Sequence, residues 1–343
     1  MAKIPIPITL EMDVNERDAV TAINRIEDWK GKEIQYKQII EGITNPNWFV
    51  KVDGKQYFMK IPGKGTEVFI DRKNVHLANT IAERVGVGPS VPYFFEDSGV
   101  EIFEWLDGYI TQTWWDCLVE ERFYACVKAM RDFHNYTGIT LPNKQSLIDQ
   151  AKDMIRITEE RGGYINPDHE KIMWLMNRIE DAALSHGLES NPCHMDTLIY
   201  NFMWNENLKD MKMIDFEYAA MSDPMFDLAV FSVDEYLSEE QDRAMIECYY
   251  GHWDEVQFAK MKLFKIVSDI KWGYWASVQA MNSTLGFDFI RYHGWKMARL
   301  RSNWEDPRVE YWIRLMHGRP IFSPGSAYRA YDERRRAALK NNK

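Results

Sequence analysis

The sequence predicts an α+β protein in which a small sheet-rich part, residues 1–106, precedes a larger and mainly helical part, residues 107–343. Strand-like segments cluster in the first part, and two of them flank Asp53-Gly54-Lys55, a typical hairpin turn. After residue 109, apolar residues recur at helical spacing over most of the chain. The turn at Asp107-Gly108 follows the last strand-like segment and therefore marks the expected boundary.

Each element is assigned from its apolar pattern and from the turn residues that interrupt it. In the first helix, for example, Ala19, Ile23 and Ile26 share one face. The expected helices are residues 15–29, 74–85, 118–136, 144–160, 168–187 and 258–282, and the expected strands are residues 34–40, 48–52, 57–61 and 100–105.

Composition excludes several classes of protein. The 343 residues carry 42 basic and 52 acidic side chains, a net charge of −10, which argues against general binding to nucleic acid or to an anionic membrane. No stretch reaches the roughly 20 apolar residues that span a bilayer, so we expect no membrane insertion. The four cysteines show no CxxC spacing, which favours reduced thiols and a cytoplasmic location. A homodimer is left open.

A second hairpin is expected between residues 201–205 and 211–215, with the turn-prone residues 206–210 as its loop. Such a hairpin places Asn201 opposite Asp215, with Asp196 on the incoming loop. Amide and carboxylate oxygens suit Mg²⁺, and a further carboxylate beside the ion can accept a proton from an attacking hydroxyl. This arrangement is typical of phosphoryl transfer.

The alternative is an ordinary surface hairpin, since single Asp and Asn residues are common near turns. The residues after Asp215 argue against it. Residues 217–229 are largely apolar but contain the carboxylates of Glu217, Asp223 and Asp227. Buried carboxylates are unfavourable unless they are paired or bound to a metal, so their presence indicates a site.

Three motifs in combination resemble the choline/ethanolamine kinase family: His194-x-Asp196-x4-Asn201, Ile214-Asp215-Phe216-Glu217-Tyr218 and Asp223-Pro224-x-Phe226-Asp227-Leu228-Ala229. The resemblance is greatest to bacterial choline kinases, extends over about residues 30–300, and includes the aminoglycoside phosphotransferases as more distant relatives. It implies a protein-kinase-like fold of two lobes, with ATP and Mg²⁺ as cofactors. Asp196 is then the expected catalytic base, and Asn201 and Asp215 are the expected metal ligands. We expect His194 to brace this loop by hydrogen bonds, and Asp227 to be structural and to accept hydrogen bonds from the loop backbone.

The resemblance also implies where nucleotide binds. The expected contacts are the strand residue Lys60, the turn residues Gly42, Thr44 and Asn45, and the hinge residues Phe103 and Trp105. From the residues alone, the simpler interpretation of Lys60 is a solvated strand residue, and the turn is equally a normal hairpin loop. The sequence departs from the family at Val75, where relatives carry the helical Glu that pairs with this lysine. Asp71 and Glu83 are candidate substitutes, although neither sits at the expected place, and the alternatives are that another carboxylate or the nucleotide itself orients Lys60.

Two tryptophans in the expected helix 258–282 are candidates for the substrate site. Trp272 and Trp275 are three residues apart and share a face, so their indoles can hold a cationic head group, although a core stripe is the plainer alternative. The family carries such a pair, followed by an aromatic segment whose last member here is Tyr292. By the same resemblance, Asp234 supplies a balancing charge, and we add Glu217 to the expected substrate residues.

We therefore expect an ATP-dependent enzyme that phosphorylates a small cationic alcohol, with choline favoured. Ethanolamine, thiamine or an aminoglycoside is the alternative acceptor. The alternative from another class is a non-catalytic sensor of nucleotide or cation, and Val75 is the residue that supports it.

Overall fold

The computed structural model describes residues 2–40, 45–63, 70–283 and 286–318. The chain forms two compact units, of which unit 1 comprises Met1–Gln112 and Tyr200–Ala219, and unit 2 comprises Thr113–Ile199 and Ala220–Lys343. Unit 1 thus continues past residue 106 and includes the second hairpin, which the sequence analysis placed in the helical part. It does so because β9 (Phe202–Asn205) pairs with β7 (Ile110–Thr111).

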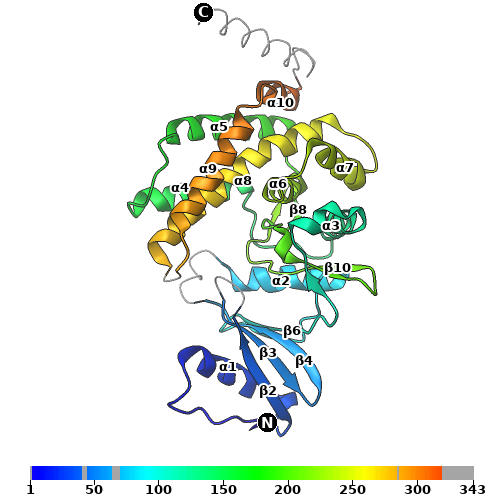
Figure 1. Ribbon diagram of the computed structural model, residues 1–343, viewed down its shortest axis with the longest axis vertical. Helices are drawn as coiled ribbons and strands as arrows, with labels where there is room; N and C mark the ends of the chain where they lie inside the picture. Colours follow the sequence, from blue (N-terminus) through cyan, green and yellow to red (C-terminus); the bar gives the residue numbers. More distant parts are fainter. Residues whose placement is uncertain (1, 41–44, 64–69, 284–285, 319–343) are drawn as a thin grey trace, which may run out of the picture. The chain divides into compact units, whose positions relative to one another are not determined.

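Unit 1 is built on a six-stranded antiparallel sheet with the strand order β1-β2-β3-β4-β6-β5 (Figure 1). The strands are β1 (Ala2–Lys3), β2 (Glu33–Ile39), β3 (Asn47–Val52), β4 (Lys55–Lys60), β5 (Tyr93–Phe95) and β6 (Val100–Glu104). The expected turn at residues 53–55 closes β3 onto β4, with Val52 opposite Lys55. A second sheet has the order β10-β9-β7, where β10 is Asp210–Met213.

Two helices accompany these sheets, α1 (Val14–Asn24) and α2 (Arg72–Arg84). The expected helix 15–29 ends early, and a separate 3₁₀ turn covers Glu27–Trp29. α2 begins where it does because the Asp71 carboxylate accepts the Lys73 and Asn74 backbone N–H groups, which lack partners within the helix.

The core of unit 1 lies between α1 and one face of the larger sheet. Ala19, Val20 and Ile23 of α1 belong to one buried apolar cluster with strand residues such as Val50 and Ile102. Burial alternates along β3, as expected for a strand with one face in the core. This packing fixes β4, and with it the position of Lys60 at its end.

Unit 2 is mainly helical. Its elements are the 3₁₀ helix Trp114–Leu118, α3 (Glu120–His134), α4 (Leu147–Glu160), α5 (His169–His186), β8 (Asn191–Cys193), β11 (Ala220–Ser222), α6 (Pro224–Asp234), α7 (Glu239–Tyr250), α8 (Glu255–Asn282), α9 (Phe289–Trp304) and α10 (Val309–Met316). Helices α3, α4, α5 and α8 lie at the expected positions, with ends shifted by a few residues.

The long helix α8 is the centre of unit 2, and it packs against α4, α6, α9 and α10 (Figure 1). Close packing on α9 requires Gly273, because a Cβ at this position would lie 2.1 Å from Cε of Met297. The short strands β8 and β11 pair antiparallel and bracket the loop that carries Asp196. The structure therefore anchors this loop at the strand before it and at the strand that follows the hairpin.

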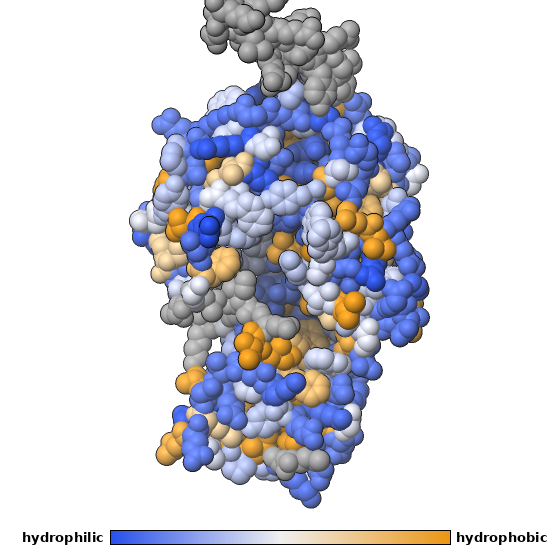
Figure 2. Space-filling view, viewed as in Figure 1, coloured by the Kyte–Doolittle hydropathy of each residue, from blue (hydrophilic) through white to orange (hydrophobic). Residues whose placement is uncertain are grey.

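Polar residues cover most of the visible surface of both units, with isolated apolar patches among them (Figure 2). No helix within the described residues is long and apolar enough to cross a membrane. The four cysteines are free, as their spacing predicted.

Trp29 offers a test of the unit 1 core. Its ring is 1% exposed and lies 4.9 Å from the ring of Tyr57 and 5.4 Å from that of Tyr93. We expect Trp29→Ala to destabilise the protein by about 3–5 kcal/mol, because it removes buried area and leaves a cavity. Thermal or urea unfolding measures this loss.

Leu10→Ala in the same unit is the matched control, since Leu10 is 93% exposed and its truncation should change stability by less than about 0.5 kcal/mol. Equal effects of the two substitutions would mean that Trp29 does not lie in a packed core.

Candidate active site

The hairpin that carries Asn201 and Asp215 exists, but its register differs from the expected one. Met213 lies opposite Phe202, and the Ile214 N–H donates to the Asn201 carbonyl oxygen at 2.9 Å. Ile214 therefore lies opposite Asn201, so the expected pairing of Asn201 with Asp215 is wrong by one residue. The reason is the loop, which is one residue shorter than predicted because Asp210 already pairs with Asn205.

Asp215 leaves the strand in an unusual conformation. Its φ is 69°, a left-handed value that is rare for a residue with a side chain. Such backbone strain is most often kept where a side chain must point in a particular direction. In this structure the Asp215 carboxylate points to Lys60.

Lys60 is held by two carboxylates from the segment that follows β10. Its Nζ donates to Oδ1 of Asp215 at 2.5 Å and lies 3.1 Å from Oε1 of Glu217. Burial opposes the charge of Lys60, but Asp215 and Glu217 outweigh it and hold the pKa of the ammonium above its ordinary value. Lys60 is therefore a fixed cation, whereas a solvated strand residue would have no such partners.

Glu217 is the centre of this group. Its Oε1 also accepts from the Asn45 amide at 2.8 Å and lies 3.4 Å from the Arg72 guanidinium. Glu217 was expected at the substrate site, and the structure places it beside Lys60 within unit 1. Its role as a substrate residue stays a prediction. Arg72 was not predicted, and nothing in its sequence context distinguishes it from other surface arginines.

The missing helical carboxylate is explained by this arrangement. Val75 is a buried residue of α2 and makes no charged contact. Asp71 caps the start of the same helix, and Glu83 accepts the Val91 N–H. Asp215 and Glu217 orient Lys60 in their place, which agrees with the expectation that another carboxylate does so.

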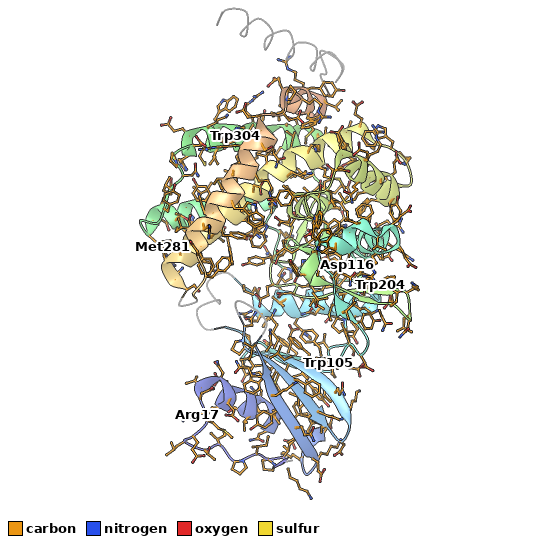
Figure 3. All side chains as sticks on the ribbon, in the orientation of Figure 1. Arg17, Trp105, Asp116, Trp204, Met281 and Trp304 are labelled. Carbon is orange, nitrogen blue, oxygen red and sulfur yellow. The ribbon has the colours of Figure 1, made fainter. Side chains whose placement is uncertain are left out.

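The remaining nucleotide candidates are only partly described. Gly42 and Thr44 lie outside the described residues. Asn45 joins the group around Glu217, and its Oδ1 accepts the Gly63 N–H at 2.9 Å. Phe103 is buried in β6, and Trp105 follows the end of that strand (Figure 3), where its N–H donates to the Gln56 carbonyl oxygen. Their contacts with nucleotide stay predictions.

In unit 2, the loop that carries Asp196 is held by the buried side chain of Asp227. One oxygen of Asp227 accepts the His194 N–H at 2.6 Å, and the other accepts the Met195 N–H at 2.7 Å. The Asp227 carbonyl oxygen also accepts from the Thr197 hydroxyl at 2.6 Å. The expectation that Asp227 is structural and binds the loop backbone is confirmed.

Asp227 is ionised because of its surroundings. Burial opposes its charge, but His134, whose Nε2 lies 2.9 Å from the carboxylate, and His194 hold the pKa of Asp227 below its ordinary value. The Asp196 N–H donates to Nδ1 of His194 at 3.2 Å, so His194 braces the loop as expected. Asp196 itself is 9% exposed, and Met195 before it has a φ of 67°.

His134, Cys193 and Asp227 have ligand-type atoms within 4.8 Å of one another. A metal at this place would need a thiolate, yet burial raises the pKa of the Cys193 thiol well above its ordinary value. The thiol lies 3.3 Å from the Ser222 carbonyl oxygen, and His134 is used by Asp227 and by the Tyr249 hydroxyl. The group therefore braces the loop.

The aromatic candidates of unit 2 do meet. The ring centroids of Trp272 and Trp275 are 5.7 Å apart, and those of Trp275 and Tyr292 are 6.2 Å apart. Two neighbours were not predicted. Trp295 is half exposed and lies 5.6 Å from Tyr292. Lys271 is fully buried beside Trp272, and its signal in the sequence is a charge within an apolar helix.

Asp234 lies near these rings but already has two cationic partners. It pairs with Lys296 and, at 2.5 Å, with Arg299, which also pairs with Asp269. Burial opposes the charge of Asp234, and the two cations hold its pKa below the ordinary value. Its role in balancing the charge of a ligand stays a prediction.

The oxygen donors suit magnesium. Asp215 offers a carboxylate and Asn201 an amide oxygen, which are hard ligands. A carboxylate has about four lone-pair directions, so Asp215 can accept from Lys60 and bind a cation at the same time. The donor set is thus consistent with the expected metal, and the assignment of Asn201 and Asp215 stays a prediction.

Asp227→Asn tests the support of the loop. We expect a loss of about 3–5 kcal/mol in stability, because an amide cannot accept from both backbone N–H groups and leaves a buried histidine unpaired. Thermal unfolding measures it, and Asp132→Asn on the half-exposed face of α3 is the control. A loss below about 1 kcal/mol would contradict the role of Asp227.

Glu235 predicts a pH dependence of stability. It is buried after α6, and burial raises the pKa of its carboxyl to about 7, although the Ile199 N–H donates to it. Because the pKa is higher in the folded state, its contribution is full below the unfolded value and is lost as the pH rises through about 7.

Glu235→Gln removes this loss and keeps an acceptor for Ile199. We expect the variant to be more stable than the parent by up to about 3 kcal/mol at pH 8, with no such gain at pH 4. Melting temperatures at the two pH values measure it. A difference that does not change with pH would show that the pKa of Glu235 is the same in the folded and unfolded states.

Comparison with known proteins agrees with this geometry. Residues 35–260 match the phosphotransferase enzyme family model. Protein LicA of Haemophilus influenzae is 23% identical over 249 residues, covering 70% of this chain and 72% of LicA. A probable ethanolamine kinase A of Dictyostelium discoideum is 23% identical over 295 residues, covering 77% of this chain and 83% of the relative.

Among solved structures, a choline/ethanolamine kinase family protein from Mesorhizobium loti superposes with a TM-score of 0.76. It is 22% identical, and the match covers 89% of this chain and 99% of that protein. The likeness confirms the expected protein-kinase-like fold. Because the family model spans more than half of the sequence, the chain belongs to the phosphotransferase enzyme family.

Proposed function

We propose that the protein transfers the γ-phosphoryl group of ATP to the hydroxyl group of a small amino alcohol, with choline favoured by the sequence and ethanolamine as the nearest alternative. The observation that carries this proposal is the buried Asp227 clamp, which holds the two backbone amides immediately before Asp196. Relatives named as choline and ethanolamine kinases support the class of acceptor. The cytoplasmic location and the homodimer stay predictions.

Asp196 is the proposed catalytic base. Its carboxylate orients the acceptor hydroxyl and takes its proton, as the hydroxyl oxygen bonds to the γ-phosphorus and ADP leaves. Most of the acceleration in such reactions comes from positioning and charge stabilisation, so a rigid loop around the base is essential. The clamp on the loop supports this role, because it restrains the residue that must align the acceptor.

Lys60 is proposed to bind the phosphates of ATP, with Asp215 and Glu217 holding its ammonium group ready. Asn201 and Asp215 are proposed to bind Mg²⁺. When bound, this ion neutralises charge on the β- and γ-phosphate oxygens. Asp215 holds Lys60 and would also offer a carboxylate oxygen to Mg²⁺, since its carboxylate has lone pairs for both.

Asp196→Asn is the direct test. We expect turnover to fall by at least about 100-fold, because the amide cannot accept the proton, while the affinity for ATP changes little. A coupled assay of ADP release with choline, ethanolamine, thiamine and an aminoglycoside measures turnover, and calorimetric titration with ATP measures binding.

Asp181→Asn is the control, since that side chain is 78% exposed on α5. An unchanged kcat in Asp196→Asn would remove Asp196 from the role of base. Binding of ATP without turnover of any acceptor in the parent protein would instead support a non-catalytic sensor.

A further inference from the structure

The side chain of Lys271 covers the indole that was expected to bind the cation of the acceptor. Its Nζ lies 3.2 Å from the centroid of the Trp272 ring. Lys271 is 0% exposed and Trp272 is 4% exposed, so this face of the indole is closed. The chain therefore places its own ammonium group where a cation–π contact with a ligand would form.

Two effects oppose the binding of a second cation over the Trp272 ring. Cation–π attraction requires the cation to stand over the ring, within about 6 Å of its centroid, and Lys271 already fills that volume. A charged Lys271 also repels another ammonium group, strongly so in a buried place. Burial lowers the pKa of Lys271, while Asp196 and Asp234 oppose that shift. The neutral amine still fills the space.

The nearby acids do not offset this repulsion for a ligand. Asp234 pairs with Lys296 and Arg299, and Asp269 pairs with Arg299. Their negative charge is thus shared with cations of α9. The rings that remain partly exposed are those of Trp275 and Tyr292, with Trp295 beside Tyr292, so closing the Trp272 face leaves a head group with fewer aromatic faces to contact.

A site with fewer open aromatic faces distinguishes between the two kinds of amino alcohol. A trimethylammonium group has no N–H, so it depends on several aromatic faces around it. A primary ammonium group is smaller and donates three hydrogen bonds, so it depends less on those faces. Closing the Trp272 face therefore weakens a quaternary ligand more than a primary one.

On the basis of the proposed function, we propose that Lys271 is a specificity-determining residue. Its amine occupies the face of Trp272, so the site selects primary amino alcohols over quaternary ones. The acceptor class of this protein is then that of ethanolamine, and choline is the poorer substrate.

Lys271→Ala in the full-length protein tests the proposal in two ways. Calorimetric titration with tetramethylammonium measures binding without any reaction, and we expect affinity to rise at least about tenfold when the indole face opens. The ratio of kcat/KM for choline to that for ethanolamine should rise by a similar factor.

Three further variants make the test specific. Lys271→Arg keeps charge and bulk and should show no gain. Lys262→Ala is the control, because Lys262 lies on the same helix with its Nζ 5.7 Å from the Phe258 ring, away from the acceptor candidates. If Lys271→Ala does not fold, Lys271→Val removes the amine and shortens the side chain, so it also opens the indole face and should gain in the same direction.

The proposal is overturned if a folded Lys271→Ala or Lys271→Val binds tetramethylammonium no better than the parent protein. It is also overturned if kcat falls equally for both acceptors with their ratio unchanged, since Lys271 would then serve only Asp196. If no amino alcohol is phosphorylated by any variant, the proposed function fails, and the titration alone decides the role of Lys271.

Discussion

The hydrogen bonds from two consecutive backbone amides to the carboxylate of Asp227 fix the loop on which the chemistry depends. His194 and Met195 donate to different oxygens of the same side chain, and His134 completes the group from α3. A buried carboxylate with these donors has little freedom, so the loop cannot shift without breaking charged hydrogen bonds. The position of Asp196 is thereby determined by α3 and α6, although it lies on neither helix.

Lys60 must also be held in a fixed orientation, and in this chain the carboxylates that hold it differ from the one in the family. The family supplies a glutamate from a helix, which would couple that helix to the lysine. Here Asp215 and Glu217 come from the segment after β10, and Val75 takes part in the apolar side of α2. Orientation of the lysine therefore depends on the hairpin and its left-handed Asp215, and α2 contacts the group through Arg72, which lies 3.4 Å from Glu217.

Much of this arrangement follows from the sequence, and the exceptions have physical reasons. Periodicity located β3 and β4, because each buries one regular face, and a long apolar stretch located α8, which is buried on all sides over most of its length. The hairpin register was wrong by one residue because Asp210 is polar yet pairs with Asn205, so composition did not mark the end of the loop. The partners of Lys60 and Asp234 were not assigned, because pairing between residues far apart in the chain leaves no local pattern. Lys271, like Lys260 and Lys265, did carry a signal, because it is a charge in an apolar helix.

The other buried lysines of α8 show why a charge in an apolar helix can be interpreted only with the structure. Lys260 pairs with Asp223 at 2.5 Å, and Lys265 pairs with Asp242 at 3.1 Å, so both tie α8 to the start of a neighbouring helix. Replacing either lysine alone changes the packing and leaves its partner carboxylate buried without a compensating cation. Lys271 differs because its nearest charged surroundings include Asp196, and its amine rests on Trp272. Two buried lysines of α8 thus form ion pairs that hold the helix in place, and the third, Lys271, lies beside the acceptor candidates.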